Sequence, residues 1–301
     1  MTRAYVHGYD ASEQQRLQDQ AASLVDLLHS DTTYEAGALV LEAGCGVGAQ
    51  TVTLAANSPH ARIVSIDVSQ PSLAQARDAV DAAGLTNVEF RHADIFALPF
   101  AKETFDHVFV CFVLEHLVDP AGALERLKHV LKPGGAITVI EGDHGSAYHF
   151  PRSDFARRAI ACQVELQARA GGNALVGREV YPLLASAGFA DVRVSPRMVY
   201  VDGSRPHLIE GFTKKTFTAM IEGVREPALD AGLMTAADFD RGIADLYRAA
   251  ADDGVFCYTF FKGVARKARA LPPDFSRACV PADTEEKKSF ADLQRSGGAQ
   301  N

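Results

Sequence analysis

The first half of the chain alternates short apolar segments with longer ones whose apolar residues recur at helical spacing. The apolar segments read ALVLEAG, ARIVSID, VEFRHAD, FDHVFVCFV and AITVIEG. Three of the segments between them predict helices over residues 49–56, 71–83 and 120–131. Strands that are apolar almost throughout are typical of parallel sheets with helices on both faces, so we expect an α/β fold.

The second half has a different pattern. It predicts helices over residues 154–170 and 178–187, the strand ADVRVSPRMVYVD, helical structure over 207–250 and the final strand VFCYTFFKGVA. We expect the last two strands to pair antiparallel at the sheet edge. The helices between them should lie over the rim formed by the carboxyl ends of the parallel strands.

The two ends of the chain carry weaker patterns. Leu17, Leu24 and Leu28 recur at helical spacing behind the candidate cap Ser12, which predicts an amphipathic helix over residues 12–28. From about residue 266 the chain contains a Pro-Pro pair and the stretch DTEEKKS, so residues 266–301 are expected to form a solvated, partly disordered tail.

Composition and charge narrow the class of protein. The chain has 301 residues, 47% of them apolar and 23% charged, as in an ordinary globular protein. Lys and Arg number 30 against 38 Asp and Glu, with no basic run, so nucleic acid is not an expected partner. No apolar run approaches the roughly 18 residues that span a bilayer, and the start of the chain lacks an apolar signal core. We therefore expect a cytoplasmic protein with no membrane partner.

The five cysteines are scattered and never occur at CxxC spacing. Neither a disulfide framework nor a zinc site is expected from this arrangement. No repeated Asp/His pattern indicates another metal, so we predict no metal site.

Three predicted strands deliver glycine or acidic residues to the same rim of the sheet. Glu42-Ala43-Gly44-Cys45-Gly46-Val47-Gly48 lies directly between a strand and a helix, where backbone can approach a ligand closely. Asp67 ends the next strand, at the distance where an acid can accept hydrogen bonds from both ribose hydroxyls. Asp94 ends the strand after that. Ligands of open α/β sheets bind at this rim, so a nucleotide-containing ligand is expected there.

Residues 37–142 resemble the class I S-adenosylmethionine-dependent methyltransferases, especially the branch of ubiquinone, menaquinone and small-molecule methyltransferases. The resemblance is carried by LEAGCGVG, SIDVS, HADIFALPF, FDHVFVCFVLEHL and LKPGGAITVIEG. A nicotinamide enzyme would share the loop and the ribose acid, but the Asp94-Ile95 pair and the Leu-Lys-Pro-Gly-Gly turn favour the methyltransferase. The resemblance implies a Rossmann-like, seven-stranded, mostly parallel sheet over residues 37–265, with an antiparallel edge strand and a helical substrate cover at about 150–250.

The resemblance also implies how S-adenosyl-L-methionine would be held. Its methionine part would lie against the glycine loop, its ribose on the acid after the second strand, and its adenine beside the residues that follow the second and third strands. Residues after the fourth strand would form the floor, and residues 1–36 would form a lid that closes over the cofactor. The implied cofactor residues are Glu42, Gly44, Cys45, Gly46, Asp67, Val68, Asp94, Ile95, Cys111 and Phe112, with Tyr9, Arg16 and Gln20 from the lid. For Asp94 a helix cap is the alternative, and for Arg16 and Gln20 a solvated helix face.

Two clusters of ionisable residues follow the fourth and fifth predicted strands. Glu115 and His116 follow the fourth, whereas Glu141, Asp143 and His144 belong to the run EGDHGS after the fifth. Methyl transfer needs alignment of the nucleophile and removal of its proton. We expect His144 to be the general base, with Glu141 or Asp143 orienting its ring; Glu115 and His116 could instead serve this role or a structural one.

The expected partner is a small-molecule acceptor held in an enclosed pocket. The EGDHGS run and the long C-terminal half are similar to bacterial natural-product methyltransferases, including those that methylate a carbon of indole. An aromatic or indole-type acceptor is therefore the working prediction, with a homodimer left open. A catalytically silent cofactor-binding regulator or scaffold is the alternative function, and another cofactor on the same fold is a third. Candidate acceptor-wall residues are Tyr148, Arg178, Tyr181, Tyr200 and Tyr258, together with Met198.

Overall fold

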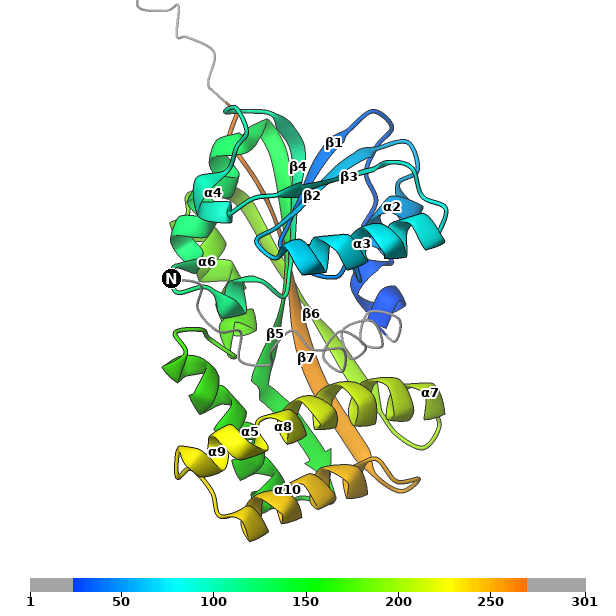
Figure 1. The fold of residues 1–301 in the computed structure, drawn as a ribbon, viewed down its shortest axis with the longest axis vertical. Helices are drawn as coiled ribbons and strands as arrows, with labels where there is room; N and C mark the ends of the chain where they lie inside the picture. Colours follow the sequence, from blue (N-terminus) through cyan, green and yellow to red (C-terminus); the bar gives the residue numbers. More distant parts are fainter. Residues whose placement is uncertain (1–23, 270–301) are drawn as a thin grey trace, which may run out of the picture. The chain divides into compact units, whose positions relative to one another are not determined.

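A seven-stranded sheet forms the centre of the protein (Figure 1). The computed structural model describes residues 24–269. The strand order is β3-β2-β1-β4-β5-β7-β6, and β7 is antiparallel to both of its neighbours. The strands are β1 Leu39–Ala43, β2 Arg62–Asp67, β3 Val88–His92, β4 Phe105–Cys111, β5 Leu131–Phe150, β6 Ala190–Val201 and β7 Val255–Arg266. The predicted mostly parallel sheet with an antiparallel edge is confirmed.

Helices connect the parallel strands as the apolar periodicity predicts. They are α2 Thr51–Asn57, α3 Gln70–Ala82 and α4 Pro120–Val130, with the short turns η1 Ile95–Ala97 and η2 Leu114–His116. Ser69 caps α3 by accepting a hydrogen bond from the Ser72 backbone, and Asp119 caps α4 in the same way. Both helices carry proline in their first turn, where its missing N–H costs nothing.

Two apolar clusters cover the two faces of the sheet. Successive strand residues alternate between them: Val40 and Phe109 belong to one cluster, whereas Leu41 and Val110 belong to the other. The first cluster includes α2 and helical residues 24–29, and the second includes α4 and α6 (Val180–Ser186). This arrangement leaves the carboxyl ends of the parallel strands uncovered by the connecting helices.

The last three strands form a long antiparallel arm that extends beyond the parallel strands (Figure 1). β5 does not end at Gly142, as the sequence pattern predicts, but continues to Phe150 because β7 pairs with it up to Asp143 and again from Tyr148 to Phe150. The EGDHGS run is therefore part of a strand and not a rim loop.

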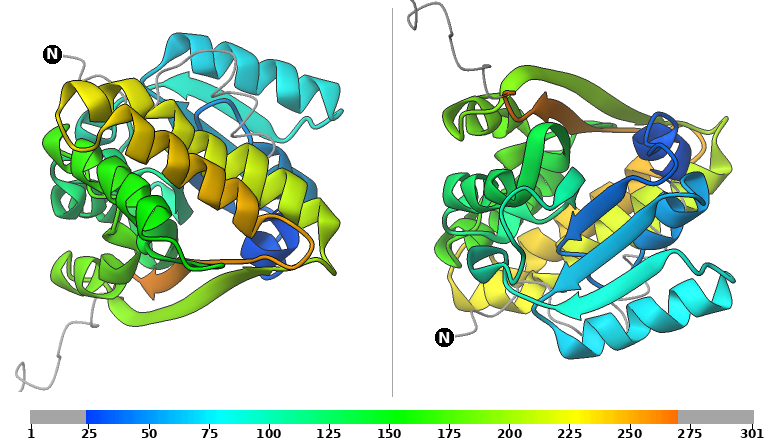
Figure 2. Two further views of the ribbon diagram at one scale, coloured as in Figure 1. Left: turned by 90° about the horizontal axis from the view of Figure 1, so that it is seen from below. Right: turned by 90° about the horizontal axis from the view of Figure 1, so that it is seen from above.

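Helices of the second half gather on one side of this arm (Figure 2). They are α5 Asp154–Arg169, α7 Pro206–Leu208, the π-helix η4 Ile209–Thr218, α8 Ala219–Gly223, α9 Arg225–Asp230 and α10 Ala236–Ala249, while η3 Val176–Glu179 leads into α6. The helical structure predicted over 207–250 consists of several helices. They bury aromatic residues of β7 and lie next to the carboxyl ends of the parallel strands.

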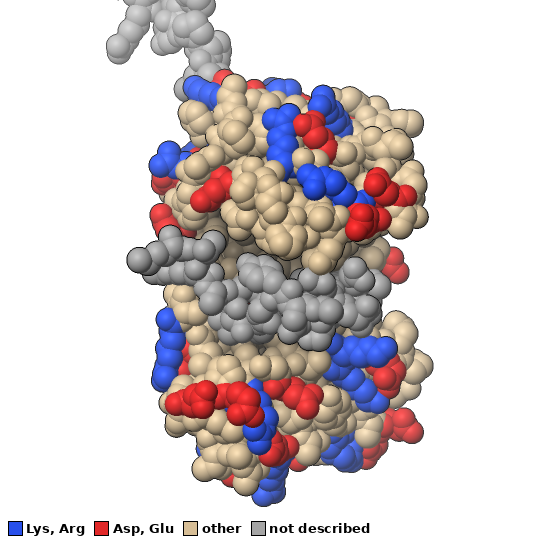
Figure 3. Space-filling model, in the orientation of Figure 1, with Lys and Arg blue, Asp and Glu red and all other residues tan. Residues whose placement is uncertain are grey.

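Residues 1–23 and 270–301 lie outside the described residues, and with them most of the predicted lid helix, the lid residues Tyr9, Arg16 and Gln20, and most of the predicted tail. Within residues 24–269 no helix is both long and apolar enough to cross a membrane. On the face seen in Figure 3, basic and acidic side chains lie beside one another over both the sheet region and the arm helices.

Candidate active site

A cavity of about 300 Å³ lies at the carboxyl ends of β1, β2 and β4, where the arm helices approach them. One half is lined by the glycine loop and by the acids after β2 and β3. The other half is lined by residues of η2, β5, β7, η4 and α8. The first half contains Glu42, Gly44, Cys45, Gly46, Asp67, Val68, Asp94, Ile95, Cys111 and Phe112; the second contains Glu115, His116, His144, Phe212, Thr216, Phe217, Met220, Tyr258 and Phe260.

The glycine loop is shaped by its contacts with β2. The backbone N–H groups of Gly44 and Cys45 both donate to the Ile66 carbonyl, at 2.8 and 3.0 Å. Gly44 has a φ of +79°, and a Cβ there would lie 2.5 Å from Val113. No other residue fits at this position without moving the turn after β4, which forms the cavity floor.

Asp67 ties the same loop to the start of α3. Its carboxylate accepts hydrogen bonds from the backbone N–H groups of Gly46 at 2.9 Å and Ser69 at 2.8 Å, one on each oxygen. A carboxylate oxygen has two lone pairs, so each can accept one more hydrogen bond from a ligand. Next to it, Val68 lines the cavity and is 55% exposed, which leaves apolar surface for a ring to cover.

Asp94 and Phe112 both lie at the rim of the cavity, where one caps a short helix and the other has an unusual backbone conformation. Asp94 accepts a hydrogen bond from the Phe96 backbone at 2.9 Å and so caps η1, while it also lines the cavity. Capping is the alternative role that the sequence predicts for Asp94, and one of its two carboxylate oxygens makes the capping hydrogen bond. Phe112 adopts a φ of +57°, and its N–H donates to the Ile140 carbonyl. Such strained backbone is found at binding sites more often than elsewhere.

Glu42 is buried beneath the loop. Its Oε2 accepts hydrogen bonds from the Thr51 hydroxyl at 2.7 Å and the Ser65 hydroxyl at 2.6 Å. Burial raises the pKa of Glu42 to about 7. The nearby charge of Asp67 also raises this pKa, whereas the hydrogen bonds from the two hydroxyls lower it. Glu42 therefore joins the strand to the start of α2 from inside the cavity wall.

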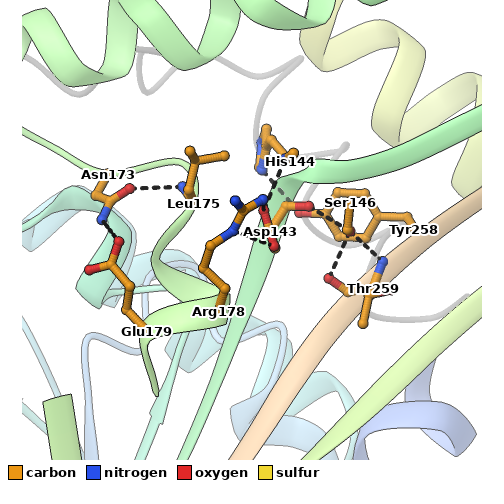
Figure 4. A network of polar contacts seen from close by, with 10 residues as sticks. Asp143, His144, Ser146, Asn173, Leu175, Arg178, Glu179, Tyr258 and Thr259 are labelled. Atoms are coloured by element: carbon orange, nitrogen blue, oxygen red, sulfur yellow. Dashed lines mark hydrogen bonds and ion pairs between the residues drawn. The ribbon is translucent and has the colours of Figure 1, made fainter. Parts of the chain in front are cut away.

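His144 is aimed into the cavity by a bulge in β5. Asp143 pairs with Thr259 and Tyr148 pairs with Cys257, so four residues of β5 lie opposite Tyr258 alone. Ser146 fills the bulge by accepting a hydrogen bond from the Thr259 N–H (Figure 4). Bulges of this kind redirect a side chain from the face that strict alternation would give it.

The ring of His144 contacts a hydroxyl and a thioether. Its Nδ1 lies 3.0 Å from the Tyr258 hydroxyl, and its Nε2 lies 3.3 Å from the Met220 sulfur. A thioether sulfur can only accept, so these contacts fit the tautomer with the proton on Nε2 and with Nδ1 accepting from Tyr258. Gly142 makes this possible, since a Cβ there would collide with the Tyr258 hydroxyl.

The acids expected to orient His144 make other contacts. Asp143 accepts two hydrogen bonds from Arg178, at 2.9 and 2.8 Å (Figure 4). Glu141 is fully buried and accepts from the backbone N–H groups of Val113 and Leu114, at 3.0 and 2.8 Å. Burial, and next the charge of Glu115, raise the pKa of Glu141 well above its usual range. The Tyr258 hydroxyl contacts the imidazole.

The second ionisable pair lies at the opposite wall. Glu115 and His116 both line the cavity, and Glu115 Oε1 lies 3.6 Å from His116 Nε2. The other oxygen of Glu115 accepts a hydrogen bond from the Gln167 side chain at 3.1 Å. The pair is therefore anchored to α5 while it faces the cavity.

Of the predicted acceptor-wall residues, Tyr258 lines the cavity and the other five do not. Tyr148 and Tyr200 flank Cys257 in the register of the arm, so they share its face, opposite to that of Tyr258. Arg178 binds Asp143, and Tyr181 is exposed on α6. Met198 is likewise exposed and outside the cavity.

The aromatic wall from η4 is not predicted by the sequence pattern. Phe212 and Phe217 are five residues apart, which places them on different faces of an α-helix but on one face of a π-helix. Among residues 24–269 there is no cluster of three or more His, Cys, Asp or Glu side chains that could hold a metal ion.

Comparison with known proteins agrees with this geometry. Residues 41–139 match the family described as "Methyltransferase domain". The chain is 32% identical over 208 residues to an uncharacterised 37.1 kDa protein in a transposon of Streptomyces fradiae, covering 68% of this chain and 59% of that one. It is 40% identical over 106 residues to a demethylmenaquinone methyltransferase of Clavibacter sepedonicus, covering 35% of this chain and 42% of that one. The chain thus spans about half the length of these relatives.

The fold also resembles that of solved structures. The crystal structure named "[4+2]-Cyclase SpnF" superposes with a TM-score of 0.52 at 22% identity, covering 84% of this chain and 82% of that one. This likeness concerns the fold alone.

Proposed function

Since residues 41–139 belong to the class I S-adenosylmethionine-dependent methyltransferases, we propose that the chain transfers a methyl group from S-adenosylmethionine to a small-molecule acceptor. One observation carries the proposal: a single cavity joins the glycine loop and Asp67 to His144 and Tyr258. A binding site for the donor therefore opens directly onto a group that can accept a proton. The fold alone would not suffice, because a similar structure is named a cyclase.

The residues present fit this cofactor. A Cβ at Gly46 would meet nothing within 4 Å, so the loop has open space there, and both oxygens of Asp67 retain acceptor capacity for the ribose hydroxyls. Val68 offers uncovered apolar surface for the adenine, and Asp94 has one oxygen beyond its capping bond for the adenine edge. Cys45, Gly46 and the backbone after β4 complete the side that would hold the methionine part, with Glu42 beneath them.

When bound, S-adenosylmethionine supplies an electrophilic methyl group on a sulfonium. The chain must then orient the acceptor, exclude water and take up one proton. Tyr258 and His144 are placed to take up the proton, because the Tyr258 hydroxyl can accept it from the acceptor while passing its own to His144 Nδ1. The acceptor atom gains a methyl group, loses a proton, and the imidazole becomes an imidazolium.

The acceptor we propose is an aromatic, indole-type natural-product intermediate, methylated at carbon, nitrogen or oxygen. Phe212, Phe217 and Phe260 form the wall beside Tyr258, and rings of this kind stack on flat acceptors. The alternative is a regulator that binds the cofactor without turnover.

The experiment separates these functions. Purified protein is titrated with S-adenosylmethionine by calorimetry and then incubated with a panel of indole, phenolic and quinol acceptors, with products identified by mass spectrometry. Binding followed by a mass gain of one methyl group supports the enzyme. Binding without a methylated product from any acceptor supports the regulator, and absence of binding contradicts both.

A further inference from the structure

The half of the cavity away from the glycine loop, which we call the acceptor chamber, is lined by aromatic side chains and by a few polar ones. Its wall comprises the nine residues from Glu115 to Phe260 given above for the second half of the cavity. Phe212, Phe217, Tyr258 and Phe260 are each no more than 2% exposed. An acceptor that enters the chamber therefore exchanges water for aromatic surface over most of its area.

No lysine or arginine lines the chamber in the part of the chain that the structure describes. Arg178 and Lys262, whose neighbours His144 and Tyr258 line the chamber, are engaged elsewhere. Arg178 forms its ion pair with Asp143 outside the cavity. Lys262, on the same strand as Tyr258 and Phe260, donates to the Leu28 carbonyl at 3.0 Å and to Asp31 at 2.6 Å.

The one carboxylate of the chamber has the wrong sign for an anionic ligand. Glu115 lines the wall beside His116, and Glu141 lies buried close behind it. A carboxylate or phosphate group on an acceptor would lose its hydration, gain no lysine or arginine partner from this wall and face the carboxylate of Glu115. A neutral polar group would instead find the Tyr258 hydroxyl and the imidazole of His144.

We propose that the acceptor is an uncharged, largely aromatic molecule with one hydrogen-bonding group, and that the chamber rejects molecules bearing a carboxylate or phosphate there. This inference rests on the proposed function and specifies its substrate class. The wall from η4 is the part that decides it, because the π-helix presents Phe212, Thr216 and Phe217 to the chamber together. Charge selection therefore depends on this wall together with Glu115, and not on the half of the cavity lined by the glycine loop.

The test uses two pairs of probes that differ only in charge. Protein saturated with S-adenosylhomocysteine is titrated with indole-3-carboxamide and indole-3-carboxylate, and then with 2-naphthamide and 2-naphthoate, at a pH of about 7.5. We expect each amide to bind at least about tenfold more tightly than its carboxylate. Equal binding, tighter binding of the carboxylates, or no binding of any of the four would overturn the inference.

A pair of variants locates the selectivity. Thr216→Lys places a cation in the chamber wall, and Thr216→Met places a neutral chain of similar length there. We expect the lysine variant to shift the preference toward the carboxylates at least about tenfold relative to the methionine variant; an equal preference in the two folded variants would contradict the assignment to this wall.

Binding of S-adenosylhomocysteine distinguishes failure of the proposed function from failure of the inference about the acceptor chamber. If wild-type protein does not bind S-adenosylhomocysteine in the preliminary titration, the proposed function fails. If it binds S-adenosylhomocysteine but treats amides and carboxylates alike, only the inference about the acceptor chamber fails.

Discussion

The His144 imidazole is held between two residues that come from distant parts of the chain. Tyr258 approaches one ring nitrogen from β7, and Met220 approaches the other from α8. The Met220 thioether has no proton to donate, whereas the Tyr258 phenol can donate its proton to Nδ1. The Nδ1 atom of His144 can therefore gain a proton, and the Tyr258 hydroxyl connects this atom to the cavity.

Replacing either partner should therefore slow methyl transfer and leave cofactor binding nearly intact. We expect His144→Ala to lower turnover about 10²–10⁴-fold, the usual contribution of general-base catalysis. Tyr258→Phe keeps the ring and its packing and should lower turnover less. For a carbon acceptor the losses should be smaller, because the proton leaves after methylation and water can take it.

His116→Ala is the matched comparison, since this residue lines the same cavity. Turnover and S-adenosylhomocysteine affinity are measured for all three variants on one acceptor. A loss confined to the His116 variant would transfer the role to the pair with Glu115.

Asp67 should dominate the affinity for the cofactor. A charged acceptor that hydrogen-bonds two hydroxyls contributes about 1.5–3 kcal/mol, so Asp67→Ala should weaken binding about tenfold or more. Part of the loss will come from the loop, because the same carboxylate holds the Gly46 backbone. Asp81→Ala, at an exposed position of α3, is the control, and calorimetric titration is the measurement. Wild-type affinity in the Asp67 variant would remove this residue from the site.

At the scale of elements, the bulge of β5 depends on the loop that follows α5. The Arg178 guanidinium binds Asp143 with two hydrogen bonds, and the His144 N–H donates to the Ala174 carbonyl at 3.0 Å. Asp143 is only 3% exposed, so it relies on this cation for its charge balance. Arg178 is therefore a positioning residue for the imidazole.

Arg178→Ala should misplace His144 and lower turnover about tenfold to a hundredfold with little change in cofactor affinity. Arg178→Lys should restore part of the loss, because an ammonium supplies the positive charge but not the planar fork of two parallel N–H donors. Arg169→Ala, which breaks an exposed ion pair on α5, is the control. The pH dependence of turnover is recorded for each variant, and unchanged turnover in Arg178→Ala would show that the bulge holds without the clamp.

The sequence predicts local features of these elements well and distant ones poorly. The strands β1 to β4, their helices and the loop at Gly44 follow from apolar periodicity and turn chemistry within a few residues. The course of β5 beyond Gly142 does not, because its partner β7 begins more than a hundred residues later. For the same reason Tyr148 and Tyr258 are equivalent as wall residues in the sequence, although the bulge and the register place them on opposite faces.

At the scale of the whole molecule, the buried acid of the glycine loop couples stability to pH. Burial raises the pKa of Glu42 from its ordinary value of 4.5 to about 7. The folded protein thus binds a proton at Glu42 more tightly than the unfolded chain does. Its contribution is fully present below pH 4.5 and is lost as the pH rises through about 7.

Glu42→Gln removes this titration and keeps an oxygen that can accept from Thr51 or Ser65. The wild type should therefore lose unfolding free energy relative to the variant between pH 5 and pH 8, by an amount on the order of 3 kcal/mol. Urea unfolding of the ligand-free proteins at four pH values measures the difference, with Glu165→Gln on the exposed side of α5 as the control. If the unfolding free energy of wild type and of Glu42→Gln depends on pH in the same way, Glu42 stays ionised throughout this pH range. The shape of the loop would then depend on a buried carboxylate held by two hydroxyls.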